Sequence, residues 1–230
     1  MAPLSPGEVQ ALVLSLQVAG LSVLGSLPVA VTLSWMLTRR RFVGRRVLDA
    51  VVHLPLVLPP VAVGYLLLML FGGRGPIGAL LAHAFGIQLV FSRGGAALAT
   101  AVMSLPLMIR AMRVSLENVD PGLEDAARTL GAKPLDRFIS ITLPLMLPGI
   151  LAGVITAFAA GLGEFGAVIT FVSNIPGQTR TLPLALYTAL QTPDGDAGAA
   201  RLAALSIGLG VAGLLLSDYL SRSVGRLLGR

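Results

Sequence analysis

Long apolar stretches without a charged side chain constrain the fold of this chain more than any other feature of its sequence. Residues 11–38 contain no Asp, Glu, Lys or Arg over 28 positions. About 20 apolar residues are enough for a helix to cross the hydrocarbon core of a bilayer. Because that core offers no water to the backbone, a crossing segment must satisfy its polar groups internally, as a helix does. The sequence therefore predicts an all-α integral membrane protein.

The composition of the chain agrees with this prediction. Hydrophobic residues make up 55% of the chain and charged residues only 12%, whereas soluble domains carry about 25% charged residues. The net charge of +6 comes mostly from basic residues beside apolar stretches, where they orient a membrane protein, so no nucleic-acid partner is expected. The chain has no cysteine, which excludes disulfides and thiolate metal ligands, and we expect no metal site.

Four further apolar stretches predict additional crossings. They are residues 49–71, 94–109, 138–163 and 199–220. Together with the first stretch they predict a polytopic bundle of about five transmembrane helices, forming a single permease domain over residues 1–230. Residues 76–91 and 182–190 are expected to form re-entrant or interfacial helices. A sixth crossing would require one of these two segments to span the membrane, against the charge distribution of the loops.

The loops predict the orientation of the bundle. Residues 39–46 contain five arginines and no acidic residue, and such a loop stays in the cytoplasm. Counting from this loop places the N-terminus outside and the C-terminus inside. A polar segment at about residues 110–137 is then cytoplasmic, and residues 173–198 are outside. The basic tail with Arg222, Arg226 and Arg230 agrees with this orientation.

The cytoplasmic segment contains the signals of a short, well-capped helix. Asp120 suits the N-cap, Pro121 suits the first helical position, and Gly131 can adopt the left-handed conformation beyond the C-cap. One face of this helix is apolar, at the spacing i, i+3, i+4 and i+7: Leu123, Ala126, Ala127 and Leu130. A helix this short needs packing partners in water. The periodicity leaves open whether this face docks in a groove of another protein or rests on the chain's own membrane helices.

The same segment resembles the cytoplasmic loop of permeases of binding-protein-dependent ABC importers. In that family E-A-A is followed by three residues, a glycine, nine residues and I-x-L-P; here Ala126 and Ala127, Gly131 and residues 141–144 reproduce the spacing. Aspartate occupies the glutamate position. The resemblance implies a type I ABC importer permease fold and a coupling helix that docks on a separate cytoplasmic ATPase. The implied coupling residues are Leu123, Glu124, Asp125, Ala126, Ala127, Leu130 and Gly131.

Two further runs, residues 53–65 and 163–177, resemble molybdate permeases. This resemblance implies that molybdate is the transported ion, with sulfate or tungstate as alternatives. It also implies a homodimer in the bacterial inner membrane, two copies of the ATPase, and an extracytoplasmic molybdate-binding protein. ATP and Mg²⁺ would bind the ATPase, and we expect no cofactor in this chain. The sequence lacks G-x-x-x-x-G-K-[ST], so we expect no ATP hydrolysis and no enzyme activity here.

A secondary transporter is the alternative from a different class. Such a protein would need ion-coupling side chains at the membrane midplane and usually shows an internal repeat. The sequence shows no convincing repeat and no charge at a predicted midplane. Loss of a co-purifying ATPase on changing Gly131 would separate the two classes.

Residues of the ion path are suggested by breaks in the apolar stretches. Prolines kink a membrane helix, and an acid within an apolar stretch is a candidate functional group. The predicted path or gate residues are Pro59, Pro60, Glu164, Phe165 and Gly166. For Glu164, gating and a structural pairing or capping role both remain open. The predicted loop facing the binding protein contains polar donors and one cation, Asn174, Gly177, Thr179 and Arg180.

Overall fold

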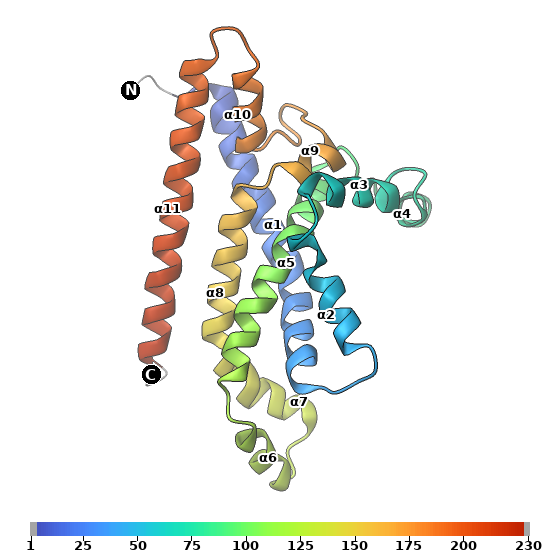
Figure 1. Ribbon diagram of the computed structural model, residues 1–230, viewed down its shortest axis with the longest axis vertical. Coiled ribbons are helices and arrows are strands. Elements are labelled where there is room, and N and C mark those ends of the chain that lie inside the picture. The colour runs from blue at the N-terminus through green and yellow to red at the C-terminus, as the bar shows by residue number, and fades with distance from the viewer. Residues whose placement is uncertain (1–3, 228–230) are drawn as a thin grey trace.

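The computed structural model describes residues 4–227, which form helices joined by short connections, with no strand among these residues (Figure 1). The long helices are α1 (Pro6–Arg39), α5 (Arg93–Glu117), α8 (Leu143–Leu162) and α11 (Asp196–Leu227). The shorter helices are α2 (Arg45–His53), α3 (Pro60–Phe71), α4 (Pro76–Phe85), α6 (Pro121–Thr129), α7 (Pro134–Arg137), α9 (Gly166–Val172) and α10 (Leu182–Leu190). A 3-10 turn (Leu54–Leu56) follows α2, and a π-helical turn (Phe138–Thr142) precedes α8. The all-α prediction is confirmed.

Helices α1, α5 and α8 pack against one another and form the centre of the bundle, and α11 lies along α8 (Figure 1). Their contacts use small residues, which let helix backbones approach closely in a membrane protein. A Cβ atom on Gly149 of α8 would lie 2.3 Å from Cβ of Ser115 in α5, so this crossing requires glycine.

Three continuous helical segments among the described residues are long and apolar enough to cross a membrane: Pro6–Arg39, Arg93–Glu117 and Pro134–Leu162. They contain the predicted crossings at residues 11–38 and 94–109, and all but the last residue of the predicted crossing at 138–163. The predicted crossing at residues 49–71 is divided into two parts, Arg45–Leu56 and Pro60–Phe71, which are bent by 115° at a break before Pro60. Residues 199–220 fall within α11. The total of five crossings and the orientation stay predictions.

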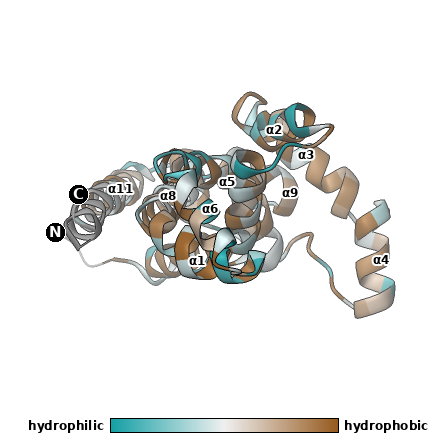
Figure 2. Cartoon of the chain, turned by 90° about the horizontal axis from the view of Figure 1, so that it is seen from below, coloured by the Kyte–Doolittle hydropathy of each residue, from teal (hydrophilic) through white to brown (hydrophobic). Residues whose placement is uncertain are grey.

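The two ends of the bundle carry different elements (Figure 1). The start of α1 and helix α10 lie at one end, and α6 and α7 lie at the other. The segments predicted as re-entrant or interfacial contain the short helices α4 and α10. Figure 2 shows α3 and α4 projecting sideways from the bundle. The side chains of Arg222, Arg226 and Arg230, on which the sequence argument for a basic tail depends, lie outside the part of the chain that the structure describes.

Candidate functional site

Helix α6 forms as its capping signals predict. The side chain of Asp120 accepts a hydrogen bond from the backbone N–H of Gly122 at 2.8 Å, and Pro121 occupies the first helical position. Gly131 follows the helix with φ of +85°, the left-handed conformation that glycine adopts without steric cost. The preceding helix α5 continues to Glu117, so it includes the first residues of the polar segment predicted at about 110–137.

The apolar face of α6 is open rather than packed on the chain's own membrane helices. Leu123 is 47% exposed and Leu130 is 88% exposed. Ala126 is also exposed, and Ala127 is partly covered. An isolated nine-residue helix is marginal in water, and docking of this open face on another protein stays a prediction.

A neighbouring side of α6 is tied to the bundle through Glu124. Its carboxylate lies 3.3 Å from Nε of Arg39 at the end of α1. The hydroxyl of Thr142 donates a hydrogen bond to the same carboxylate at 2.9 Å. Thr142 is fully buried in the π-helical turn before α8. We refer to Arg39, Glu124 and Thr142 as the Glu124 cluster.

Arg39 extends the Glu124 cluster to a third helix. Its Nη2 donates hydrogen bonds to the carbonyl oxygens of Leu116 at 3.2 Å and Val119 at 2.8 Å, at the end of α5. The cluster therefore connects α6 with α1, α5 and the start of α8. π-helical turns occur frequently at functional sites. Sequence reasoning placed Glu124 among the coupling residues but missed this network, because no sequence spacing relates positions 39, 124 and 142.

The predicted path residues come from two regions of the chain, and the structure brings them together where α3 packs against α9. A Cβ atom on Gly166 would lie 2.7 Å from Cβ of Pro60. A Cβ atom on Gly64 would lie 2.6 Å from the carbonyl oxygen of Ala167. Pro59 directly precedes α3. The ring of Phe165 packs against Tyr187 of α10, with ring centroids 5.2 Å apart.

Glu164 lies in the break between α8 and α9 and caps α9. Its carboxylate accepts a hydrogen bond from the backbone N–H of Ala167 at 2.9 Å. Burial raises the pKa of this carboxyl group, and hydrogen bonds from the backbone of Ala167 and Phe165 oppose that rise. The capping role considered from the sequence is therefore present in the structure, and a gating role stays a prediction.

The predicted loop facing the binding protein lies at the end of the bundle opposite α6. Asn174 accepts a hydrogen bond from Nε of Arg180 at 2.9 Å and donates one to Thr188 of α10 at 2.8 Å. Arg93 donates to the carbonyl oxygen of Gly177 at 2.8 Å. Gly177 and Arg180 line a cavity of about 230 Å³ between this loop, α10 and the start of α1.

Thr179 has a different position from the other residues predicted for this loop. Its side chain is fully buried. Its hydroxyl donates to the carbonyl oxygen of Ser173 and accepts from the N–H of Ile175, both at 2.9 Å. These two hydrogen bonds of Thr179 stabilise the conformation of the loop. Among residues 4–227, no group of three His, Cys, Asp or Glu side chains is placed to hold a metal ion.

Comparison with known proteins identifies the family. The family described as "Binding-protein-dependent transport system inner membrane component" matches residues 26–226. The chain belongs to this family. The match includes the whole of α6 and the Glu124 cluster. The permease also has the fold expected for its family, since the crystal structure of a bacterial ABC transporter involved in alginate import superposes with a TM-score of 0.72. That alignment covers 96% of this chain and 80% of the other at 20% identity, so it establishes the fold alone.

Two curated relatives differ in how much of the permease they match. The molybdenum transport system permease protein ModB of Escherichia coli K12 is 57% identical over 227 residues, 99% of both chains. The sulfate transport system permease protein CysT of Salmonella typhimurium is 40% identical over 168 residues, 73% of this chain and 60% of the relative. The similarity to the molybdenum permease is therefore both higher and more extensive.

Proposed function

We propose that this permease forms the membrane path of an ATP-driven importer for molybdate. The observation that carries the proposal is the 57% identity to the E. coli molybdenum permease over nearly the full length of both chains. The open apolar face of α6 supplies the physical link to a motor, because this chain lacks a phosphate-binding loop of its own. Sulfate is the second candidate ion, on the basis of the shorter similarity to the sulfate permease.

We propose that a cytoplasmic ABC ATPase binds α6 and drives transport. Leu123 and Leu130 would insert into a groove of the ATPase, in the helix-in-groove mode of recognition. Movement of α6 would pass through Glu124 to the ends of α1 and α5 and to the start of α8. ATP can drive the bundle between inward-open and outward-open forms only if the ATPase binds those forms with different free energy.

A second copy of the permease completes the proposed path. The arm formed by α3 and α4 projects from the bundle (Figure 2). Its exposed side chains include Tyr65, Met69, Leu80 and Phe85. An apolar arm of this size is typical of a surface that packs on another protein or on lipid. We assign it to a homodimer in which two permeases enclose the path, with two ATPases at the α6 end and a molybdate-binding protein at the end that carries Asn174 and Arg180.

Uptake measurements test the proposed ion. Membrane vesicles that contain the permease, its ATPase and the binding protein are expected to accumulate molybdate only when ATP is supplied. Excess tungstate is expected to compete, and sulfate is expected to compete less. Stronger uptake of sulfate than of molybdate would assign the permease to the second candidate ion. ATP-independent uptake by the permease alone would favour a secondary transporter instead.

Co-purification tests the proposed docking face. Leu130 directly follows α6 and is the more exposed of the two leucines on its apolar face. Changing Leu130 to glutamate is expected to lower the amount of ATPase that purifies with the permease by about tenfold, because it places a charge in an apolar groove. Val43→Glu is the matched control, since Val43 is fully exposed in the arginine-rich loop and lies outside α6. The intact complex is expected to contain two copies of the permease and two copies of the ATPase. Equal loss of ATPase in both variants would contradict the assignment of α6.

A further inference from the structure

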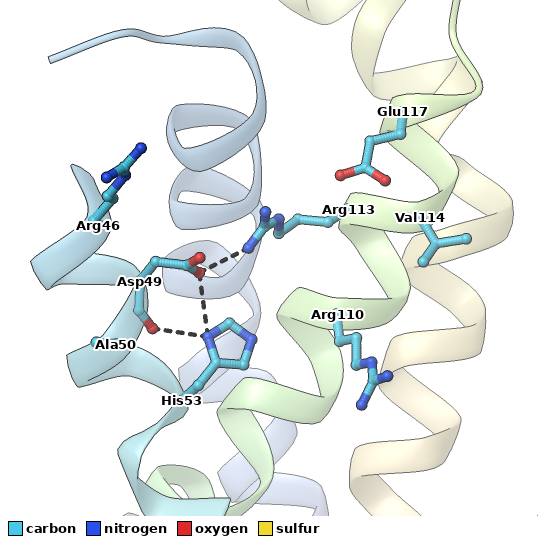
Figure 3. Close-up of a pocket in the computed structure, with 8 residues that line it drawn as sticks. All are labelled: Arg46, Asp49, Ala50, His53, Arg110, Arg113, Val114 and Glu117. Atoms are coloured by element: carbon cyan, nitrogen blue, oxygen red, sulfur yellow. Dashed lines mark hydrogen bonds and ion pairs between the residues drawn. The ribbon is translucent and has the colours of Figure 1, made fainter.

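A groove with several charged side chains lies between α2 and α5 (Figure 3), in the half of the molecule that contains α6 (Figure 1). Its volume is about 510 Å³. It is lined by Arg46, Asp49, Ala50 and His53 from α2, and by Arg110, Arg113, Val114 and Glu117 from α5. The groove is separate from α6, from the α3–α9 contact and from the loop that contains Asn174 and Arg180.

Both walls of the groove are built by the same helical spacing. The four α2 residues stand at i, i+3, i+4 and i+7, and so do the four α5 residues. Each set forms one stripe along its helix, and the two stripes face each other. Charged side chains are costly within membrane helices and occur there mainly for function or for pairing with each other. In a chain with only 12% charged residues, three arginines, two carboxylates and one histidine thus gather on two facing stripes.

Pairing within the groove accounts for only part of its charge. Nη1 of Arg113 donates a hydrogen bond to the carboxylate of Asp49 at 2.7 Å. Nδ1 of His53 lies 3.3 Å from the same carboxylate oxygen. Figure 3 shows these three side chains meeting across the groove. The negative charge of Asp49 is thus already balanced by Arg113.

Donors remain unused after this pairing. Within residues 4–227, Arg46 and Arg110 have no hydrogen bond or ion pair. Nε of Arg113 is buried and also lacks a partner among those residues. Glu117 is exposed to solvent, where its charge is screened. Three guanidinium groups against two carboxylates leave the groove with an excess of positive charge and of N–H donors.

We infer that this groove binds a tetrahedral oxyanion group. Guanidinium groups present planar pairs of N–H donors that match the oxygens of such anions, and charge strengthens these hydrogen bonds. Arg46 and Arg110 come from opposite walls and lie at opposite ends of the groove, with the Asp49–Arg113 pair between them (Figure 3). The chemistry fits both a free oxyanion that has crossed the permease and the phosphate headgroup of an anionic lipid, since basic pockets at the cytoplasmic ends of membrane helices also bind headgroups. The inference rests on the proposed function for the identity of the free ion.

The test measures binding to the assembled complex of permease and ATPase, without ATP and without the binding protein. In the first arm the complex is held in nanodiscs of zwitterionic lipid, and the binding of molybdate, sulfate and phosphate is titrated. In the second arm the nanodiscs contain phosphatidylglycerol, and native mass spectrometry counts the anionic lipid retained. Each arm compares the wild type with Arg46→Gln/Arg110→Gln and with the control Arg41→Gln/Arg45→Gln. The control also removes two arginine charges, at residues that do not line the groove.

The groove variant is expected to weaken binding by at least about tenfold in one of the two arms, whereas the control changes it little. Loss in the first arm assigns the groove to the free ion, and loss in the second arm assigns it to the lipid. Arg110→Lys is expected to give intermediate binding, because lysine keeps the charge but loses the planar pair of donors. Retention of the ATPase by each variant shows that it has folded.

Equal behaviour of the groove variant and the control in both arms would overturn the inference. Failure of the proposed function is distinguishable from this result. It would appear as absent ATP-dependent molybdate uptake by the wild-type permease, whatever the groove binds.

Discussion

Replacing Glu124 with leucine is expected to separate ATP hydrolysis from ion uptake. The variant leaves Arg39 without its carboxylate and Thr142 without its acceptor, while the exposed apolar face of α6 stays unchanged. The side chains of Arg39 and Glu124 are 14% and 22% exposed, so losing this partly buried pair should cost about 1–3 kcal/mol. We expect the ATPase to remain bound and active, and the number of ions moved per ATP to fall by about tenfold or more.

Two conservative variants identify which contact in the Glu124 cluster transmits the movement. Glu124→Gln removes the charge facing Arg39 and can still accept a hydrogen bond from Thr142. Thr142→Val removes the hydroxyl and keeps the shape of the buried side chain. Asp125→Asn is the matched control, because Asp125 pairs with Arg128 on the exposed surface of the same helix, and such surface pairs contribute at most about 1 kcal/mol. If uptake per ATP is unchanged in Glu124→Leu, or falls equally in Asp125→Asn, the Glu124 cluster does not transmit the movement.

Changing Gly131 to valine is expected to abolish ATP-dependent uptake by disordering the end of α6. Gly131 has φ of +85°, and a β-branched residue in this conformation is strained by about 1–3 kcal/mol. A Cβ atom at this position would meet no other heavy atom within 4 Å, so the expected effect comes from backbone strain alone. Loss of co-purifying ATPase, together with loss of uptake, is the measurement.

Gly131→Asn separates backbone strain from the loss of glycine itself. Asparagine tolerates the left-handed conformation better than other side chains. We therefore expect Gly131→Asn to keep most of the uptake that Gly131→Val loses. If both variants lose uptake equally, a close approach of the partner ATPase at Gly131 is the cause, rather than strain.

The helical architecture and α6 could be predicted because local signals determine them. Charge-free stretches determine where helices are stable in lipid, and Asp120, Pro121 and Gly131 determine where α6 begins and ends. The sequence also placed Pro60 and Gly166 in one candidate site, although their contact depends on how α3 packs against α9.

Features that depend on how distant helices meet could not be predicted. The 115° bend before Pro60 was visible only as a cluster of prolines, which indicates a break but not its angle. The Glu124 cluster joins residues separated by 85 and 18 positions along the chain. The polar stripe on α2, with Arg46, Asp49 and His53, and the facing stripe on α5 became apparent only from the packing of the two helices.

Helix α6 presents its open apolar face and its contact with the bundle on different sides. Leu123 and Leu130 point away from the bundle, whereas Glu124 points into it. Substitutions on the outward side can therefore adapt α6 to a different ATPase without altering how movement of α6 reaches the membrane helices. Across related transporters, the residues that recognise the ATPase and the Glu124 cluster can then change at independent rates. Hybrid transporters could be assembled by exchanging only the outward-facing residues of this short helix.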